Sequence, residues 1–419
     1  MWDNSGKKRK LVNVLLIIIT IPLIIWLVIA IREAQEKMNS EDSVLMEVYQ
    51  QQQQEQTQAR KKEDQKIVLE YQKDMETVQK YLPGIICWGD ILTKGTSGNV
   101  SFPDVLQDMI DENLCDVYQL SKAFDDTAGF SKYDWSTFKL KIPVVNMGSG
   151  DENSYTVLGR SGVVPFVIDK EFTIPAGTEK VGILIRSESG SDVTPMTGGS
   201  EGINNVFIDG IEGELSIEAD AQRYTSSSYY YFNRIKPGKE VTVPKGTKII
   251  TDATDKYKDY IHVVWIGTYG NYKDTNDLIE QIKTLLARQT NNSDRYIVLG
   301  LCSSNGKWYF GGTYFDIMDS AMIQAFGDRY INVRKYLISD GCVDAGIEPT
   351  SSDRKYMESG VIPASFQSNS GNSELTASAY ELIGNLVFDR MDKLGYFDEV
   401  REELKIDKNA AELLKAQTQ

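Results

Sequence analysis

Acidic and hydroxyl side chains follow the first short apolar run of the sequence, and these residue types are suited to chemistry. Residues 85–88 are apolar, Gly89 and Asp90 come directly after them, and Thr93 lies at the start of a glycine-rich loop. A short, continuous apolar run is typical of a buried strand in a parallel sheet. Because ligands bind beyond the carboxyl ends of the strands in open α/β sheets, we expect this stretch to line the functional site.

Four stretches of the chain together resemble the signature blocks of the SGNH (GDSL) hydrolases. Residues 89–95 read Gly-Asp-Ile-Leu-Thr-Lys-Gly, where that family has Gly-Asp-Ser-Leu-Thr-x-Gly. Residues 144–153 resemble the second block, Val-x-Asn-x-Gly-x-Gly-Gly-Glu, of bacterial members with a β insertion. Residues 265–271 resemble the third block, Gly-Thr-Asn-Gly, and residues 373–380 lie where the last block has Asp-x-x-His-Leu. The resemblance implies a three-layer α/β/α, flavodoxin-like parallel-sheet domain and descent from ester hydrolases.

The resemblance also implies which residues would act, and the matching positions of this chain hold other side chains. In the family a serine attacks an ester carbonyl, a histidine takes its proton and an aspartate orients the histidine. Two backbone amides and an asparagine stabilise the oxyanion. The replaced positions are Ile91 for the serine, Asp151 for the glycine, Tyr269 for the asparagine, Gly371 for the aspartate and Glu374 for the histidine. We predict that no catalytic residue is intact and that the protein is a pseudoenzyme.

The histidine content of the chain leads to the same prediction without any alignment. The sequence contains one histidine, His262, inside the apolar run 260–265. A residue in such a run is expected to pack in the core or at a strand edge, and it precedes the loop where chemistry would occur. A serine–histidine pair is therefore excluded.

The candidate binding residues at the expected mouth of the sheet are mostly acidic. If the fold is of the expected type, Asp90, Asp151 and Glu374 converge there, with Tyr269 beside them; the remaining pocket candidates are Thr93 and Asn271. Clustered carboxylates bind cations or cationic ligands, or act as a general acid and base. Alternatively, the pocket has lost its function and its charges are merely solvated. The sequence leaves these interpretations open.

Other classes of site and partner find little support in the composition. Four cysteines lack metal-ligand spacing, the loop 95–98 lacks a nucleotide-binding fingerprint, and we predict no cofactor and no metal site. A formal net charge of −15 argues against nucleic acid as a partner.

The N-terminal region predicts a membrane anchor. Residues 11–31 contain no charged side chain and follow a basic segment, 1–10. Such a run predicts an uncleaved, single-pass transmembrane helix and signal-anchor, with a cytoplasmic N-terminus and an extracellular C-terminal domain. Residues 32–82 then predict a helical, coiled-coil-like stalk. Apolar residues at 68, 71, 75, 78 and 82 favour either self-association through residues 64–82 or the packing of one helix on the globular domain.

The globular part predicts an α/β domain interrupted by a β-rich segment. Apolar strands at 85–88, 142–146, 261–266, 296–301 and 330–333 alternate with helical patterns, which predicts a sheet covered on both faces. We assign residues 83–162 and 261–397 to this domain, 163–260 to an all-β insertion and 398–419 to a C-terminal helical tail. The aromatic run 229–232 is either a binding platform or core packing.

Together these features predict a membrane-anchored, extracytoplasmic pseudo-esterase that serves as a binding or scaffolding ectodomain at the cell envelope. An envelope glycan or a protein is the expected partner. The alternative is an active carbohydrate or lipid esterase, or an acetyl-transfer enzyme, with a rearranged site.

Overall fold

The computed structural model describes residues 5–95, 100–124, 139–150, 152–188, 190, 193, 205–217, 230–251, 253–289, 294–303, 312–368 and 374–408; within these ranges, the side chains of 5–19, 21, 40–42, 254, 312 and 313 are not described. The chain divides into two compact units, Met1–Tyr71 and Gln72–Gln419.

The first helix, α1, runs without a break over Ser5–Tyr81. Across the described residues, no helix has both the length and the apolar character needed to cross a bilayer. A spanning helix needs about 20 consecutive apolar residues. In the predicted segment 11–31, however, the described side chains are those of residue 20 and residues 22–31, and Arg32 ends the run. The predicted transmembrane helix and signal-anchor at 11–31 are therefore wrong on this finding, and so are the cytoplasmic tail 1–10 and the single-pass localisation that rest on them.

The last turns of α1 belong to the second unit and are buried there. Val78 and Leu82 lie in the same core as Ile85, and Met75 packs against that core. The Tyr118 hydroxyl donates a 2.7 Å hydrogen bond to Asp74. The end of the apolar seam is thus covered by the chain's own globular part, and the coiled-coil interpretation has no support in the structure.

The centre of the second unit is a five-stranded parallel sheet in the order β14-β13-β12-β1-β2. In the central pairs, Ile85 lies opposite both Val144 and Ile261. The strands lie where the apolar runs predict them, with ends that differ by a few residues: β1 Ile85–Gly89, β2 Val144–Gly148, β12 Ile261–Trp265, β13 Tyr296–Leu299 and β14 Tyr330–Ile331.

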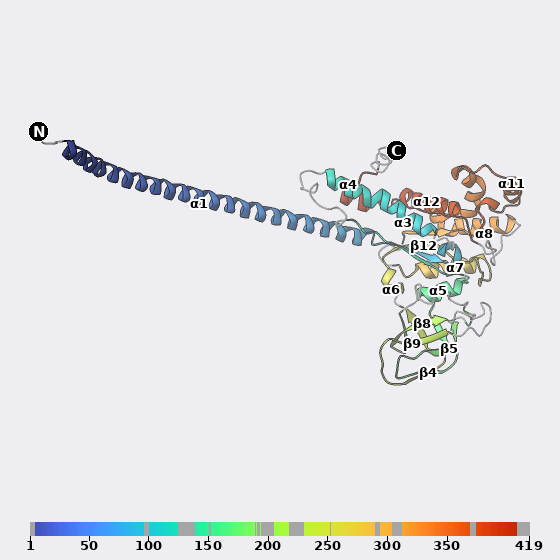
Figure 1. Cartoon of the computed structure of the whole chain (residues 1–419). Coiled ribbons are helices and arrows are strands. Elements are labelled where there is room, and N and C mark those ends of the chain that lie inside the picture. The colour runs from blue at the N-terminus through green and yellow to red at the C-terminus, as the bar shows by residue number, and fades with distance from the viewer. Residues whose placement is uncertain are drawn as a thin grey trace. The chain divides into compact units, whose positions relative to one another are not determined.

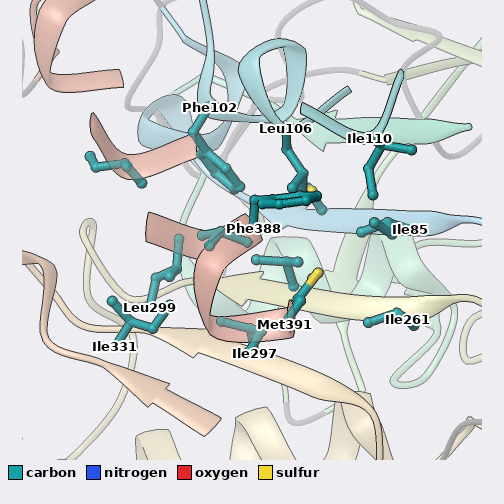
Figure 2. Close-up of a cluster of buried hydrophobic side chains, with 14 of the residues drawn as sticks. Ile85, Phe102, Leu106, Ile110, Ile261, Ile297, Leu299, Ile331, Phe388 and Met391 are labelled. Atoms are coloured by element: carbon teal, nitrogen blue, oxygen red, sulfur yellow. The ribbon is translucent and has the colours of Figure 1, made fainter. Parts of the chain in front are cut away.

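Helices cover both faces of this sheet because alternate strand residues point to opposite sides. Ile85 and Cys87 enter one apolar cluster, whereas Ile86 and Trp88 enter another. Figure 2 shows the first cluster, in which Phe102, Leu106 and Ile110 face the strand residues. Its helices are α3 Phe102–Ile110, η1 Asp111–Cys115, α4 Asp116–Phe124 and α12 Ala377–Lys393. The other face carries α5 Ser154–Ser161, α6 Ala253–Tyr257, α7 Thr275–Leu286 and α8 Gly312–Phe326 (Figure 1).

Short helices complete the unit around the strand ends and the C-terminus. They are α2 Ile91–Lys94, η5 Gly327–Arg329, α9 Val333–Tyr336, η6 Leu337–Gly341, α10 Cys342–Asp344, α11 Ser351–Glu358, η7 Ala364–Phe366 and α13 Asp398–Leu404. Val400, Leu404 and Ile406, from the predicted C-terminal tail, are buried in the first cluster.

A separate antiparallel sheet lies between β2 and β12 in the chain. Seven strands form it in the order β5-β9-β8-β7-β11-β3-β6, and β10 pairs with β4 beside it. The strands are β3 Phe166–Ile168, β4 Phe172–Ile174, β5 Val181–Ile183, β6 Ile185–Ser187, β7 Val206–Ile208, β8 Ile211–Ile217, β9 Tyr230–Arg234, β10 Val241–Val243 and β11 Lys248–Thr251 (Figure 1). This near-barrel has its own core, in which Tyr230 and Phe232 are buried. Those two aromatic side chains are packing residues, and residue 229 lies outside the described residues.

The observed architecture therefore corrects the predicted fold class. A five-stranded parallel sheet and a separate antiparallel near-barrel are present, and the residues that the structure describes include no helix fit to span a membrane, contrary to the prediction.

Burial at the end of α1 predicts different effects for two leucines, one directly after the helix and one within it. Leu82→Ala should lower the free energy of unfolding by about 2–5 kcal/mol, because it removes a fully buried side chain from the core. Leu69, which is 64% exposed in α1, is the control, and Leu69→Ala should change stability by less than about 0.5 kcal/mol. Urea unfolding of both variants measures this, and equal losses would contradict the packing.

Candidate functional site

The strand order places a candidate site at the carboxyl ends of β1 and β12. Numbered along the chain, the parallel strands lie in the order 2-1-3-4-5. Successive connections from the first strand therefore leave in opposite directions, which opens a crevice beyond its carboxyl end. Asp90 follows β1, and Gly267 and Thr268 follow β12.

Asp90 is fully buried at this point and joins the two loops. One carboxylate oxygen caps α2 by accepting a 3.0 Å hydrogen bond from the Leu92 amide, and the other accepts a 3.3 Å bond from the Thr268 amide. Burial raises the pKa of Asp90 to about 7, because the charged form loses its hydration. The Asp90 side chain therefore links the loop after β1 to the loop after β12.

Ile91, at the position matched to the serine nucleophile, begins α2 and points into the core. It is 6% exposed and belongs to the apolar cluster of Trp265 and Tyr380. Helix α2 lies very close to the strands: a methyl group added at Gly148 would lie 2.1 Å from the Lys94 amide nitrogen. Ile91 therefore contributes to the packing of the core.

A buried ion pair that the sequence did not suggest holds the ends of β1 and β2. Arg160, on α5, lies 2.9 Å from Glu152, and both side chains are almost completely buried. The same guanidinium donates to the carbonyl oxygens of Met147 at 2.7 Å and Gly89 at 3.2 Å. Glu152 matches the glutamate of the second block, which was the one available signal for this pair.

The loops after β2 and β12 are also joined. The Ser154 hydroxyl lies 3.1 Å from the Gly270 carbonyl and 3.2 Å from that of Asn271. Asn271 has a positive φ of 69°, a conformation that asparagine tolerates better than most residues. Its carbonyl also accepts a 3.2 Å bond from Gln281. Tyr269 is half-buried against the first apolar cluster.

The predicted convergence of three carboxylates is described only in part. Asp151 and Gly371 lie outside the described residues. Glu374 is half-buried just before α12, and Tyr380 is buried in that helix. Burial raises the pKa of Tyr380, and the negative charges of Asp90 and Glu374 raise it further.

The chain's one histidine lies far from this site within its own strand. His262 is the second residue of β12, at the amino end, and its Nε2 lies 3.1 Å from the Tyr257 carbonyl. Burial lowers its pKa to about 4, so the ring is neutral at physiological pH. Described residues at the strand ends thus include no imidazole base for a hydroxyl nucleophile.

Comparison with known proteins assigns the chain to no family. No protein-family model matches the chain, and no curated protein is significantly similar to it. Within the described part of the chain, no three histidine, cysteine, aspartate or glutamate side chains lie close enough to hold a metal ion.

Because the Arg160–Glu152 pair is buried, we expect removal of the Arg160 guanidinium to destabilise the protein substantially. Arg160→Met should lower the free energy of unfolding by about 3–5 kcal/mol, because it removes the cation that is paired with a buried carboxylate. Arg186, which pairs with Asp169 at 2.8 Å nearer the surface, is the control, and Arg186→Met should cost about 0–1 kcal/mol. Denaturant unfolding at neutral pH distinguishes them, and similar costs would argue against the buried pair.

Because His262 is buried in its neutral form, we expect its contribution to stability to depend on pH. The pKa of His262 is below its value in the unfolded chain, so its contribution to stability is present above about pH 6.5 and is lost as the pH falls toward 4. NMR titration of the imidazole carbon-bound protons should show no protonation between pH 8 and pH 5. The sole histidine makes the signal unambiguous, and a midpoint near 6.5 in the folded protein would refute burial in the neutral form.

Proposed function

We propose that this protein is a non-catalytic binding or scaffolding protein built on an SGNH-hydrolase-like framework. The observation that carries the proposal is the burial of Ile91 in the apolar core, at the position matched to the nucleophile. An aliphatic side chain offers neither a nucleophile nor a proton, and its role as a packing residue is incompatible with a reacting group at that point.

The state of the neighbouring polar groups supports the same proposal. Asp90 accepts hydrogen bonds from two backbone amides, and Arg160 is bound to Glu152 and to strand-end carbonyls. His262 is neutral and lies at the opposite end of its strand. Polar groups that a hydrolase would direct at a substrate are here used to hold the loops together.

We infer the ligand class from the resemblance. SGNH hydrolases act on acylated carbohydrates and lipids, so an acylated glycan bound without turnover is the ligand we propose. A protein partner is the alternative outcome, and binding of this kind would use the surface around the joined loops after β1, β2 and β12.

The proposal is tested by measuring turnover and binding on the same purified chain. Chromogenic acetyl and butyryl esters should not be hydrolysed above the buffer rate, and a fluorophosphonate probe should not label the protein. An O-acetylated oligosaccharide should bind in calorimetry and be recovered intact. Ester turnover that Asp90→Asn abolishes would instead establish an active esterase with a rearranged site.

A second variant tests whether the general base is missing as well as the nucleophile. Ile91→Ser should remain inactive toward the same esters, because no histidine lies beside the introduced hydroxyl. Ile91→Val, which retains the apolar contact, controls for loss of folding, and circular dichroism confirms that both variants are folded. Activity gained by Ile91→Ser would show that a usable base is present.

A further inference from the structure

A hollow lies beside the carboxyl-terminal ends of α7 and α8, where the parallel sheet begins. Its volume is about 250 Å³, and Tyr296, the first residue of β13, forms part of its wall. The strands are parallel, so this hollow lies at the opposite end of the sheet from Asp90 and is not part of the candidate site. A cavity of about 150 Å³ is already large enough for one benzene ring.

The wall of the hollow is mostly apolar. Leu286 and Ala287 line it from the end of α7, and Ala325 and Phe326 line it from the end of α8. Leu286 and Phe326 also belong to the apolar cluster that covers this face of the sheet. Because the two alanine side chains end at Cβ, they leave space that larger side chains would fill.

Two aromatic rings belong to this wall and pack against each other. The rings of Tyr296 and Phe326 lie edge to face, with centroids 6.2 Å apart and planes at 85°. Aromatic pairs prefer this arrangement or offset stacking, at centroid separations of about 4.5–7 Å. An aromatic ligand in the hollow would make further contacts of this kind with the same two side chains.

Gln289 supplies the hollow with a polar group of fixed orientation. Its side chain is 6% exposed, and Nε2 donates hydrogen bonds to the carbonyl oxygens of Tyr260 at 3.1 Å and Arg295 at 3.4 Å. These bonds fix the amide, because only its nitrogen can donate. The Oε1 atom is buried and has no hydrogen-bond partner among the described residues. An unpaired buried acceptor costs about 1–3 kcal/mol, so a donor from a ligand would be stabilising there.

The charges around the hollow favour a neutral ligand. Lys283 also lines it, but this side chain is half exposed and pairs with Glu280 at 2.9 Å. The described residues of the lining include no carboxylate, so a cationic ligand would have no counter-ion there. An anionic ligand would have to compete with Glu280 for the ammonium group.

We propose that the hollow binds a small neutral aromatic molecule that carries one N–H or O–H donor, as phenol and indole do. The ring packs against Tyr296, Phe326 and Ala325, and the donor bonds Gln289 Oε1. Binding here is independent of the proposed function, because no residue of the hollow belongs to the candidate site.

The test measures binding of phenol and indole to the full chain by saturation-transfer difference NMR. Both should give a signal, with a Kd of about 1 mM or below, and indole should displace phenol. Benzylammonium, a cation of similar size, should not compete, because no carboxylate lines the hollow. No signal from phenol or indole at concentrations well above that Kd would overturn the proposal.

Two pairs of variants locate the bound ring. Ala325→Leu should fill the hollow and weaken phenol binding at least about tenfold. Ala321→Leu, at a half-buried alanine one turn earlier on α8 and outside the lining, should leave it unchanged. Gln289→Met should weaken phenol binding about fivefold through loss of one hydrogen bond. Gln281→Met, at a buried glutamine that bonds the Asn271 carbonyl instead, should not. Phenol binding that Ala325→Leu leaves unchanged would refute the site.

A ligand without a donor separates the hydrogen bond from the apolar contact. Toluene should bind with an affinity that Gln289→Met leaves unchanged, because it has no donor for Oε1. Phenol binding as insensitive to Gln289→Met as toluene binding would overturn the proposed ligand class. Circular dichroism checks that each variant is folded, and competition between indole and phenol on the wild-type chain tests the site where one is not.

Discussion

The carboxyl ends of β1 and β2 depend on one buried cation, the guanidinium of Arg160. A carbonyl oxygen has two lone pairs, so at a strand end it can accept a side-chain bond as well as a backbone bond. The Gly89 carbonyl, for example, also accepts a 3.2 Å bond from the Ser149 amide. Arg160 bonds the carbonyls of Gly89 and Met147, and Glu152 neutralises its charge. Because the pair is shielded from water, removing either partner leaves the other uncompensated. The ends of β1 and β2 are therefore held together by this pair.

Other side chains at the candidate site form links of the same kind. Asp90, Ser154 and Arg160 each connect two strand-end loops through hydrogen bonds to the backbone. A site held together in this way has a fixed shape. It is suited to presenting a fixed surface to a ligand.

Several features of the fold were predictable from local patterns. The five parallel strands coincide with short apolar runs because a strand buried on both faces admits few polar residues. The division of residues 163–260 from the rest followed from alternating strands and frequent turn residues. The membrane prediction relied on the composition of 11–31 alone, and it was wrong because no helix among the described residues is long and apolar enough to cross a bilayer. The coiled-coil prediction lacked support because the end of the seam is buried against the chain's own core.

By itself, the sequence determined which residue types follow the first strand, an aspartate and then an isoleucine, and that the whole chain contains one histidine. Side-chain chemistry is a local property, so these facts needed no coordinates. Tertiary structure alone decided how those groups are used. Asp90 is a buried link between two loops, and Arg160 comes from a helix to bond the ends of two strands. Burial and long-range hydrogen bonding depend on which distant segments pack together, and no local pattern in the sequence records that.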